Sequence, residues 1–503
     1  MDLRRILAVA SFLLYAAAAL VAIDRWPTAW QPEYDLIVPT AISNVVYGRQ
    51  LGLIDGNVMA EFQQVFRAEG VNPKSVEKAV ETAARGDIPR GTTITKAEAI
   101  GIGQPLFADL AMRLFGPHLS SMSYCFLLLM AISTLAFVGR YRDERLIFVP
   151  LQFVALTCIL LTPVFTDPSI RDQVSIGGNR FFGVLGILPA LHILFEFVDS
   201  ATPPSRESRT NWILLGTQLL IMTLVLLVRS ANAYMLVPAI CAAIFTVYRS
   251  RDNQTERLRL YRKFSNAAIL SIVFTSMLIA CVPNYVKSGH IGGLFWHRAF
   301  VSFTLHPEWP FGNLRDVYAC TKFIPEGLTR DGGGDRNGHC VWWVYPPNQT
   351  RSIQEVQDKT YGPEYETAVR NALFYVIFSY PRQSLQLYLF YKPIRILDTF
   401  RGALLWQLAR VPQLITLLAA LQLALFVWFV AVNADKTPFK FAPTFGVLGF
   451  FWLLSFAPAL VAWASLWTSV DMVFYMYAVF ALVNAFLVQS ATMQRRYIRL
   501  RRI

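Results

Sequence analysis

Long apolar stretches recur along the chain and are separated by shorter polar connections. A helix that crosses the hydrocarbon core of a bilayer, about 30 Å thick, needs about 20 mostly apolar residues. Only helices satisfy every backbone polar group in spans of this kind. The pattern therefore predicts an all-α polytopic membrane protein with about ten transmembrane helices, at residues 6–23, 119–138, 146–165, 181–197, 212–228, 234–248, 267–286, 411–432, 441–465 and 472–490. Residues 6–23 are too long an apolar run for a cleaved signal, so we expect them to remain as the first span.

Composition supports a membrane protein, and the distribution of basic residues predicts its orientation in the membrane. Hydrophobic residues make up 54% of the 503 residues and charged residues 16%, which is less charge than the roughly 25% of soluble domains. Basic residues mark the cytoplasmic connections of a membrane protein. They gather at Arg4 and Arg5 and then in every second connection, at residues 140–145, 206–209, 249–263, 436–440 and 495–502. Both termini are therefore expected in the cytoplasm, with the protein in a bacterial inner (plasma) membrane.

The net charge of +13 is mainly a signal of this topology. A nucleic-acid partner would need basic residues on one soluble face, and no such domain is expected here. Membrane lipids are expected partners, since the basic tail can also meet anionic headgroups.

The topology leaves two long segments on the extracytoplasmic side and divides the chain into three parts. Residues 1–285 form a transmembrane module with a first outer loop, 24–117, that carries a helical insertion at 53–97. Residues 286–410 form a second outer loop or cap, in which 362–397 are expected to be an amphipathic helix followed by an interfacial helix broken at a proline. Residues 411–503 hold the last transmembrane helices and the basic tail.

Two of the six cysteines, Cys320 and Cys340, share the second outer loop. A disulfide between them would close a Gly-rich loop and stabilise it by about 3 kcal/mol, and the predicted compartment is oxidising. Two free thiols are the alternative. The other four cysteines fall in predicted spans and are expected to be packing residues.

Glu33 and Asp35 follow the first span and precede a predicted helix over residues 34–51. Carboxylates at that position interact favourably with the helix dipole, which is reason enough for them to be there. Asp109 is expected to pair with Arg113, four residues further along a helix.

Four sequence stretches together resemble a known superfamily. They are Asp35, Ala41 and Gly48 followed by "RQLG", then "GQPLFADLAMRLFGPHLSSM" from Gly103, "GGNRFFGVLGILPALHIL" and "VRSANAYMLVPAI". In order and spacing they are similar to the GT-C superfamily of integral-membrane glycosyltransferases, which use polyprenyl-phosphate-linked sugar donors. The resemblance covers about the first half of the chain.

This resemblance implies transfer of a sugar to an acceptor hydroxyl of a glycan or lipid outside the cytoplasm. The lipid phosphate is a good leaving group, so the enzyme must chiefly deprotonate the acceptor, and Asp35 is the expected general base, with Glu33 as the alternative. Arg180 and Arg229, at the outer ends of spans, would stabilise the phosphate, unless they are snorkelling anchors. We expect Asp35, Arg180 and Arg229 to converge on one cavity.

Three further residues complete the predicted site. Glu98 could assist the base or hold a divalent cation, or be a solvated loop residue. Gln104 occupies the position before Pro105 where the superfamily often has proline, lysine or histidine. His297 would contact the acceptor or phosphate from an aromatic stretch, residues 293–312, that suits either a sugar platform or an interfacial belt.

Two other functions share these features. A transporter or flippase for lipid-linked sugars would usually carry ionisable residues near mid-bilayer, whereas here the charges gather at span ends. A lipid-linked saccharide ligase or polymerase would use the same chemistry. No Gly-rich phosphate loop and no His-Glu-x-x-His motif occurs in the chain.

Overall fold

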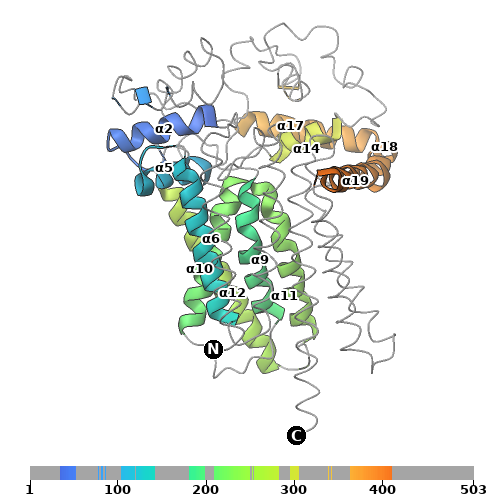
Figure 1. Cartoon of the computed structure of the whole chain (residues 1–503). Coiled ribbons are helices and arrows are strands. Elements are labelled where there is room, and N and C mark those ends of the chain that lie inside the picture. The colour runs from blue at the N-terminus through green and yellow to red at the C-terminus, as the bar shows by residue number, and fades with distance from the viewer. Residues whose placement is uncertain are drawn as a thin grey trace.

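Figure 1 shows a computed structural model of the chain. It describes residues 34–52, 78, 81–82, 85, 103–118, 120–141, 181–198, 209–249, 252, 254–281, 295–304, 338, 341–342 and 363–410. Every regular element in these ranges is a helix, and none is a strand. The prediction of an all-α protein is confirmed for this part of the chain.

A bundle of roughly parallel and antiparallel helices forms the first half of the molecule (Figure 1). It contains α5 (Gly103–Phe115), α6 (Ser120–Tyr141), α9 (Ile187–Val198), α10 (Arg209–Val228), α11 (Val237–Arg249) and α12 (Gln254–Ala280). Three stretches, Ser120–Arg140, Thr210–Val228 and Arg257–Ala280, are long and apolar enough to cross a membrane. They overlap three of the predicted spans, although α12 begins well before the predicted start at residue 267, and they support a membrane protein.

Two further predicted spans, 181–197 and 234–248, begin differently from the others. Each opens with a 3₁₀ helix, η2 (Phe181–Gly186) and η4 (Ser230–Leu236), before α9 and α11. Pro189 and Pro238 lie in the first turns of these α-helices, where a missing backbone N–H costs nothing. The predicted spans at 6–23, 146–165, 411–432, 441–465 and 472–490 lie outside the described residues.

Helix α2 (Tyr34–Val46) lies across one end of the bundle and packs on α5 (Figure 1). We call this end, where α5 begins and α10 finishes, the α5 end. Gly48 follows α2 with φ of 60°, and Gly116 ends α5 with φ of 93°. Only glycine adopts such conformations without strain, and the two turns bring the chain from α2 to α5 and from α5 to α6.

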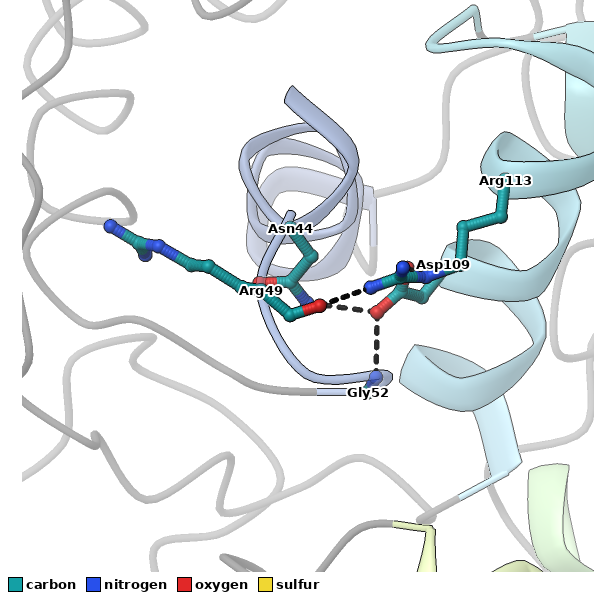
Figure 2. A network of polar contacts seen from close by, with 5 residues as sticks. All are labelled: Asn44, Arg49, Gly52, Asp109 and Arg113. Carbon is teal, nitrogen blue, oxygen red and sulfur yellow. Dashed lines mark hydrogen bonds and ion pairs between the residues drawn. The ribbon is translucent and has the colours of Figure 1, made fainter. Parts of the chain in front are cut away.

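The buried carboxylate of Asp109 joins α2, the following turn and α5 (Figure 2). It accepts hydrogen bonds from Asn44 Nδ2 at 2.9 Å, Gly52 N at 2.6 Å and Arg113 Nε at 2.8 Å. Arg113 Nη2 also donates to the carbonyl of Arg49. The predicted Asp109–Arg113 ion pair is therefore confirmed. Burial raises the pKa of Asp109, and the Gly52, Asn44 and Arg113 contacts oppose that rise.

Replacing Asp109 with asparagine should loosen the turn over residues 47–52. The variant loses the charge that strengthens three hydrogen bonds, and each such bond contributes about 1.5–3 kcal/mol. Hydrogen exchange of the Gly52 amide should accelerate by about ten-fold or more. The matched control is Asp398→Asn, an exposed acid of a different helix, which should leave Gly52 unchanged. Equal protection in both variants would contradict this role.

The last described helices form a second cluster beside the bundle (Figure 1). It comprises α14 (Phe295–Thr304), α17 (Pro363–Ser379), α18 (Pro381–Gln386), the π-helix η6 (Leu387–Tyr391) and α19 (Lys392–Arg410). The break between α17 and α18 falls at Tyr380 and Pro381. Whether these helices lie at a membrane interface stays a prediction, although the exposure of Phe378 at 77% suits one.

Part of the aromatic stretch 293–312 is buried in the core of this cluster. Phe300 and Phe303 are fully buried with Trp342 and Tyr365, so for these two phenylalanines both predicted roles, sugar platform and interfacial belt, are wrong. Glu366 accepts hydrogen bonds from the backbone N–H groups of Trp296 and His297, at 2.9 and 3.2 Å. A carboxylate from α17 thus satisfies the open N–H groups at the start of α14.

Lys392 is buried where α19 meets α14. Its Nζ donates to Ser302 Oγ at 3.1 Å and lies 4.4 Å from the centre of the Tyr388 ring. Burial disfavours the charged ammonium and lowers the pKa of Lys392 to about 7. Burial also raises the pKa of Tyr388 to about 12, so this tyrosine stays neutral where the lysine titrates.

The stability of the α14–α19 contact should therefore rise with pH from about 7 to about 10. In this range the unfolded lysine keeps the proton that the folded lysine releases, so stability gains up to about 1.4 kcal/mol per pH unit. Below about pH 7 both states are protonated and the dependence ends. Lys392→Met should abolish this rise. The measurement is the ratio of the α19 hydrogen-exchange rates in the wild type and in the variant at each pH. The exposed Arg401→Gln serves as control, and an unchanged ratio across the range would refute the effect.

Three charged side chains join α6, α9 and α12 at the end opposite to α5. Glu196 of α9 accepts hydrogen bonds from Arg140 Nε and Lys263 Nζ, and Lys263 Nζ also reaches the Glu196 carbonyl at 2.8 Å. The side chains are 6%, 11% and 14% exposed for Glu196, Arg140 and Lys263. This triad fixes the three helices to one another.

Little of the predicted insertion at 53–97 is described. Lys78, Glu81 and Thr82 are helical, and Arg85 pairs with Glu81 on an exposed surface at 3.2 Å. The helical residues among them fit the predicted helical insertion. Cys320 and Cys340 lie outside the described residues, so their disulfide stays a prediction. Cys125, Cys241 and Cys281 are free, as expected of packing residues.

Candidate functional site

The strongest candidate site lies at the α5 end, where the start of α5 meets the end of α10. A Cβ placed on Gly103 would lie 2.4 Å from the backbone nitrogen of Val228. Only glycine permits this approach, which brings the first turn of α5 against the last turn of α10. Gln104 and Arg229, two of the predicted substrate-binding residues, directly follow Gly103 and Val228.

The helices η2 and η4 complete the junction. Phe107, one turn after Gln104, packs edge-to-face on Phe182 of η2, with ring centroids 4.7 Å apart. The neighbouring Gly183 lies against η4, since a Cβ placed there would be 2.9 Å from Asn232 Oδ1. The backbone N–H of Asn232 in turn donates to the carbonyl of Arg229 at 3.0 Å. These contacts form a closed ring through α5, α10, η4 and η2, which we call the α5 junction.

Two carboxamide side chains are buried at the α5 junction. Gln104 is 1% exposed and Asn232 is 6% exposed. Neither Nε2 nor Oε1 of Gln104 has a hydrogen-bond partner, and neither does Nδ2 of Asn232. Arg229 is half-buried and belongs to the same ring of contacts through its backbone. The α5 junction therefore combines one cation with unused neutral donors and acceptors in a setting that largely excludes water.

Such a combination suits a ligand with both a charged and a neutral polar part. A guanidinium forms strong hydrogen bonds with a phosphate, and a carboxamide both donates to and accepts from hydroxyl groups. Within the ranges that the structure describes, no three His, Cys, Asp or Glu side chains gather as a metal site would require.

The other predicted site residues are only partly placed. Asp35 lies in the first turn of α2, which packs on α5, but its side chain is not among those described. Glu33, Glu98 and Arg180 lie outside the described residues. The predicted convergence of Asp35, Arg180 and Arg229, and the divalent cation at Glu98, stay predictions.

His297 lies in the second cluster and not at the α5 junction. It is 4% exposed, and its Nδ1 is 2.5 Å from the Tyr365 hydroxyl. A Cβ placed on Gly338 would lie 3.0 Å from the same Nδ1, so the imidazole is closely surrounded. These contacts give His297 a packing role, and its contact with an acceptor or phosphate stays a prediction.

Sequence analysis missed Asn232. The residue lies within the stretch "VRSANAYMLVPAI" that was matched for its basic residue and its exit into a span. A polar side chain in an otherwise apolar approach to a helix was the available signal. Its burial depends on the 3₁₀ geometry of η4, which periodicity did not show.

Comparisons with known proteins do not place the chain in a family. No family model, no curated protein and no solved structure matches the chain.

Proposed function

We propose that the protein is a GT-C-type glycosyltransferase that moves a sugar from a polyprenyl-phosphate donor to an acceptor hydroxyl. The supporting observation is the α5 junction, a ring of contacts that includes the first turn of α5 with Gln104 and the segment after α10 with Arg229 and Asn232, and in which the amides of Gln104 and Asn232 are buried. The same residues belong to two of the stretches that resemble the superfamily. The site would lie on the extracytoplasmic side of a bacterial inner membrane, and the acceptor would be a glycan or lipid.

In this proposal Arg229 binds the phosphate of the donor. It directly follows α10, a helix long and apolar enough to span a membrane. A cation at this place can reach a lipid headgroup without entering hydrocarbon. Positive charge in a site that excludes water stabilises the departing lipid phosphate more strongly than it would in water.

Helix α2 would carry the general base. Asp35 is in a helix that packs against α5, and the Asp109 network fixes the far end of that helix to α5. A rigid connection matters because a general base must be held within hydrogen-bond reach of the proton that it removes.

The rival proposal is a transporter or flippase for lipid-linked sugars. The charged residues of the described bundle argue against it, because Arg229 lies at one end and the Arg140–Glu196–Lys263 triad at the other. Transport sites usually place such groups near the middle of the membrane. A saccharide ligase or polymerase would be a variant of the proposed chemistry with a different acceptor.

The test uses the purified full chain in lipid nanodiscs with a radiolabelled polyprenyl-phosphate sugar. We expect release of polyprenyl phosphate as the sugar moves to the hydroxyl of an added glycan or lipid acceptor, and we expect Arg229→Gln to weaken donor binding by about 10- to 100-fold, since a charge-assisted hydrogen bond contributes about 1.5–3 kcal/mol. Arg262→Gln removes an exposed arginine of α12 near the opposite end and is the matched control. Uptake of donor into vesicles without bond cleavage, or equal binding by both variants, would reject the proposal.

A further inference from the structure

The two unpaired amides at the α5 junction contrast with a third buried amide in the same bundle. Gln218 of α10 is fully buried, like Gln104. Its Nε2 donates to the Ser133 carbonyl at 2.7 Å, and its Oε1 accepts from Ser133 Oγ at 2.8 Å. The bundle thus satisfies a buried glutamine where that side chain only joins helices.

Leaving such a group unpaired is costly. A buried donor or acceptor without a partner costs about 1–3 kcal/mol, and a leucine of similar size at the same place would avoid that cost. Gln104 and Asn232 together leave three polar atoms unpaired at one junction. Water or a ligand can supply the partner that the protein does not.

The two polar atoms of the Asn232 amide have different surroundings. The carbonyl oxygen of Asn232 faces Gly183, where an added Cβ would approach to 2.9 Å. The amide nitrogen is the unpaired atom. Asn232 therefore offers N–H donors, while Gln104 offers both a donor and an acceptor.

We infer that Gln104 and Asn232 bind hydroxyl groups of the sugar carried by the lipid phosphate. This inference rests on the proposed function and assigns a separate part of the donor to each group. Arg229 binds the charged phosphate, and the two amides bind the neutral sugar. Carboxamides match hydroxyls because each hydroxyl both donates and accepts, whereas a neutral amide adds no charge to balance a second phosphate or a metal ion.

The test separates stability from sugar binding with one pair of variants. Gln104→Leu removes unpaired polar atoms, so it should raise the melting temperature of the ligand-free protein by about 2 °C. Gln218→Leu, the matched control, breaks two hydrogen bonds and should lower it. Asn232→Leu should also raise the melting temperature, so that the conclusion does not depend on a single substitution.

Binding is then measured with two probes, polyprenyl phosphate and the same lipid phosphate carrying a sugar. In the wild type the sugar should strengthen binding. Gln104→Leu and Asn232→Leu should each bind the bare lipid phosphate normally and lose about ten-fold of the affinity gained from the sugar. Arg229→Gln should weaken binding of both probes.

Two results would overturn the inference. The first is an unchanged sugar contribution in both leucine variants. The second is a lowered melting temperature in both, which would show that water or the protein itself satisfies the amides. Either result can occur while sugar transfer is intact, and a lost sugar contribution can occur without any transfer. The inference and the proposed function therefore fail separately.

Discussion

Glu196→Gln should lower the free energy of unfolding by about 3 kcal/mol, because it removes the carboxylate that pairs with two cations in a largely buried site. Arg140 and Lys263 come from α6 and α12, and both hold the Glu196 side chain of α9 between them. The loss is large because breaking a buried ion pair exposes the full desolvation cost of the remaining charge. We expect a clear drop in melting temperature of the full chain in nanodiscs.

The matched control is Glu81→Gln. Glu81 also pairs with an arginine, Arg85, but those side chains are 60% and 70% exposed. Exposed pairs contribute about 0–1 kcal/mol, since water screens them. If both glutamine variants melt at the same temperature, the triad does not hold the bundle together. Partial recovery in Glu196→Gln with Lys263→Gln would identify the unpaired lysine as part of the cost.

Local sequence signals predicted the described helices well. The spans at 119–138, 212–228 and 267–286 correspond to α6, α10 and α12 because twenty apolar residues in a row have few alternatives to a helix. The Asp109–Arg113 pair was also predictable, since four residues bring two side chains together on any α-helix. These predictions depended only on residues close in sequence.

Contacts between distant residues were not predictable in the same way. Glu196 is 56 residues from Arg140 and 67 from Lys263, and hydropathy gives no partner for a charge at a span end. The roles of Phe300 and Phe303 in the aromatic stretch 293–312 were misassigned for the same reason. Composition could not show that Val341 and Trp342 would cover Phe300 and Phe303 in a core.

The candidate site combines residues that the sequence indicated with contacts that it did not. The resemblance to GT-C proteins drew attention to Gln104 and Arg229, but it did not show that Gly103 brings them to one junction. Asn232 joins them only because η2 and η4 are 3₁₀ helices that pack against each other. The α5 junction depends on close packing at two glycines. Gly103 lies against the backbone of Val228, and Gly183 lies against Asn232.

Asp35→Asn should lower the rate of sugar transfer by about 100- to 10,000-fold, the usual contribution of a general base. Asparagine keeps the size of the side chain but cannot accept the proton of the acceptor hydroxyl. Donor binding should be unchanged, since the proposal assigns that step to Arg229 and the buried amides. The transfer rate and donor affinity are measured separately, with labelled donor and with each acceptor that the wild type uses.

Glu33→Gln and Asp398→Asn complete this experiment. Glu33 is the other candidate base, so a larger loss in Glu33→Gln than in Asp35→Asn would move the role to Glu33. Asp398 is an exposed acid of α19 and should have no effect. If neither Asp35→Asn nor Glu33→Gln slows transfer, a carboxylate at the start of α2 is not the base.

Because a general base contributes only where it reaches the acceptor proton, a large loss in Asp35→Asn with normal donor binding would place the acceptor beside α2. Arg229 and the amides would then bind the donor from the α10 side of α5, so that the two substrates meet across the first turn of one helix.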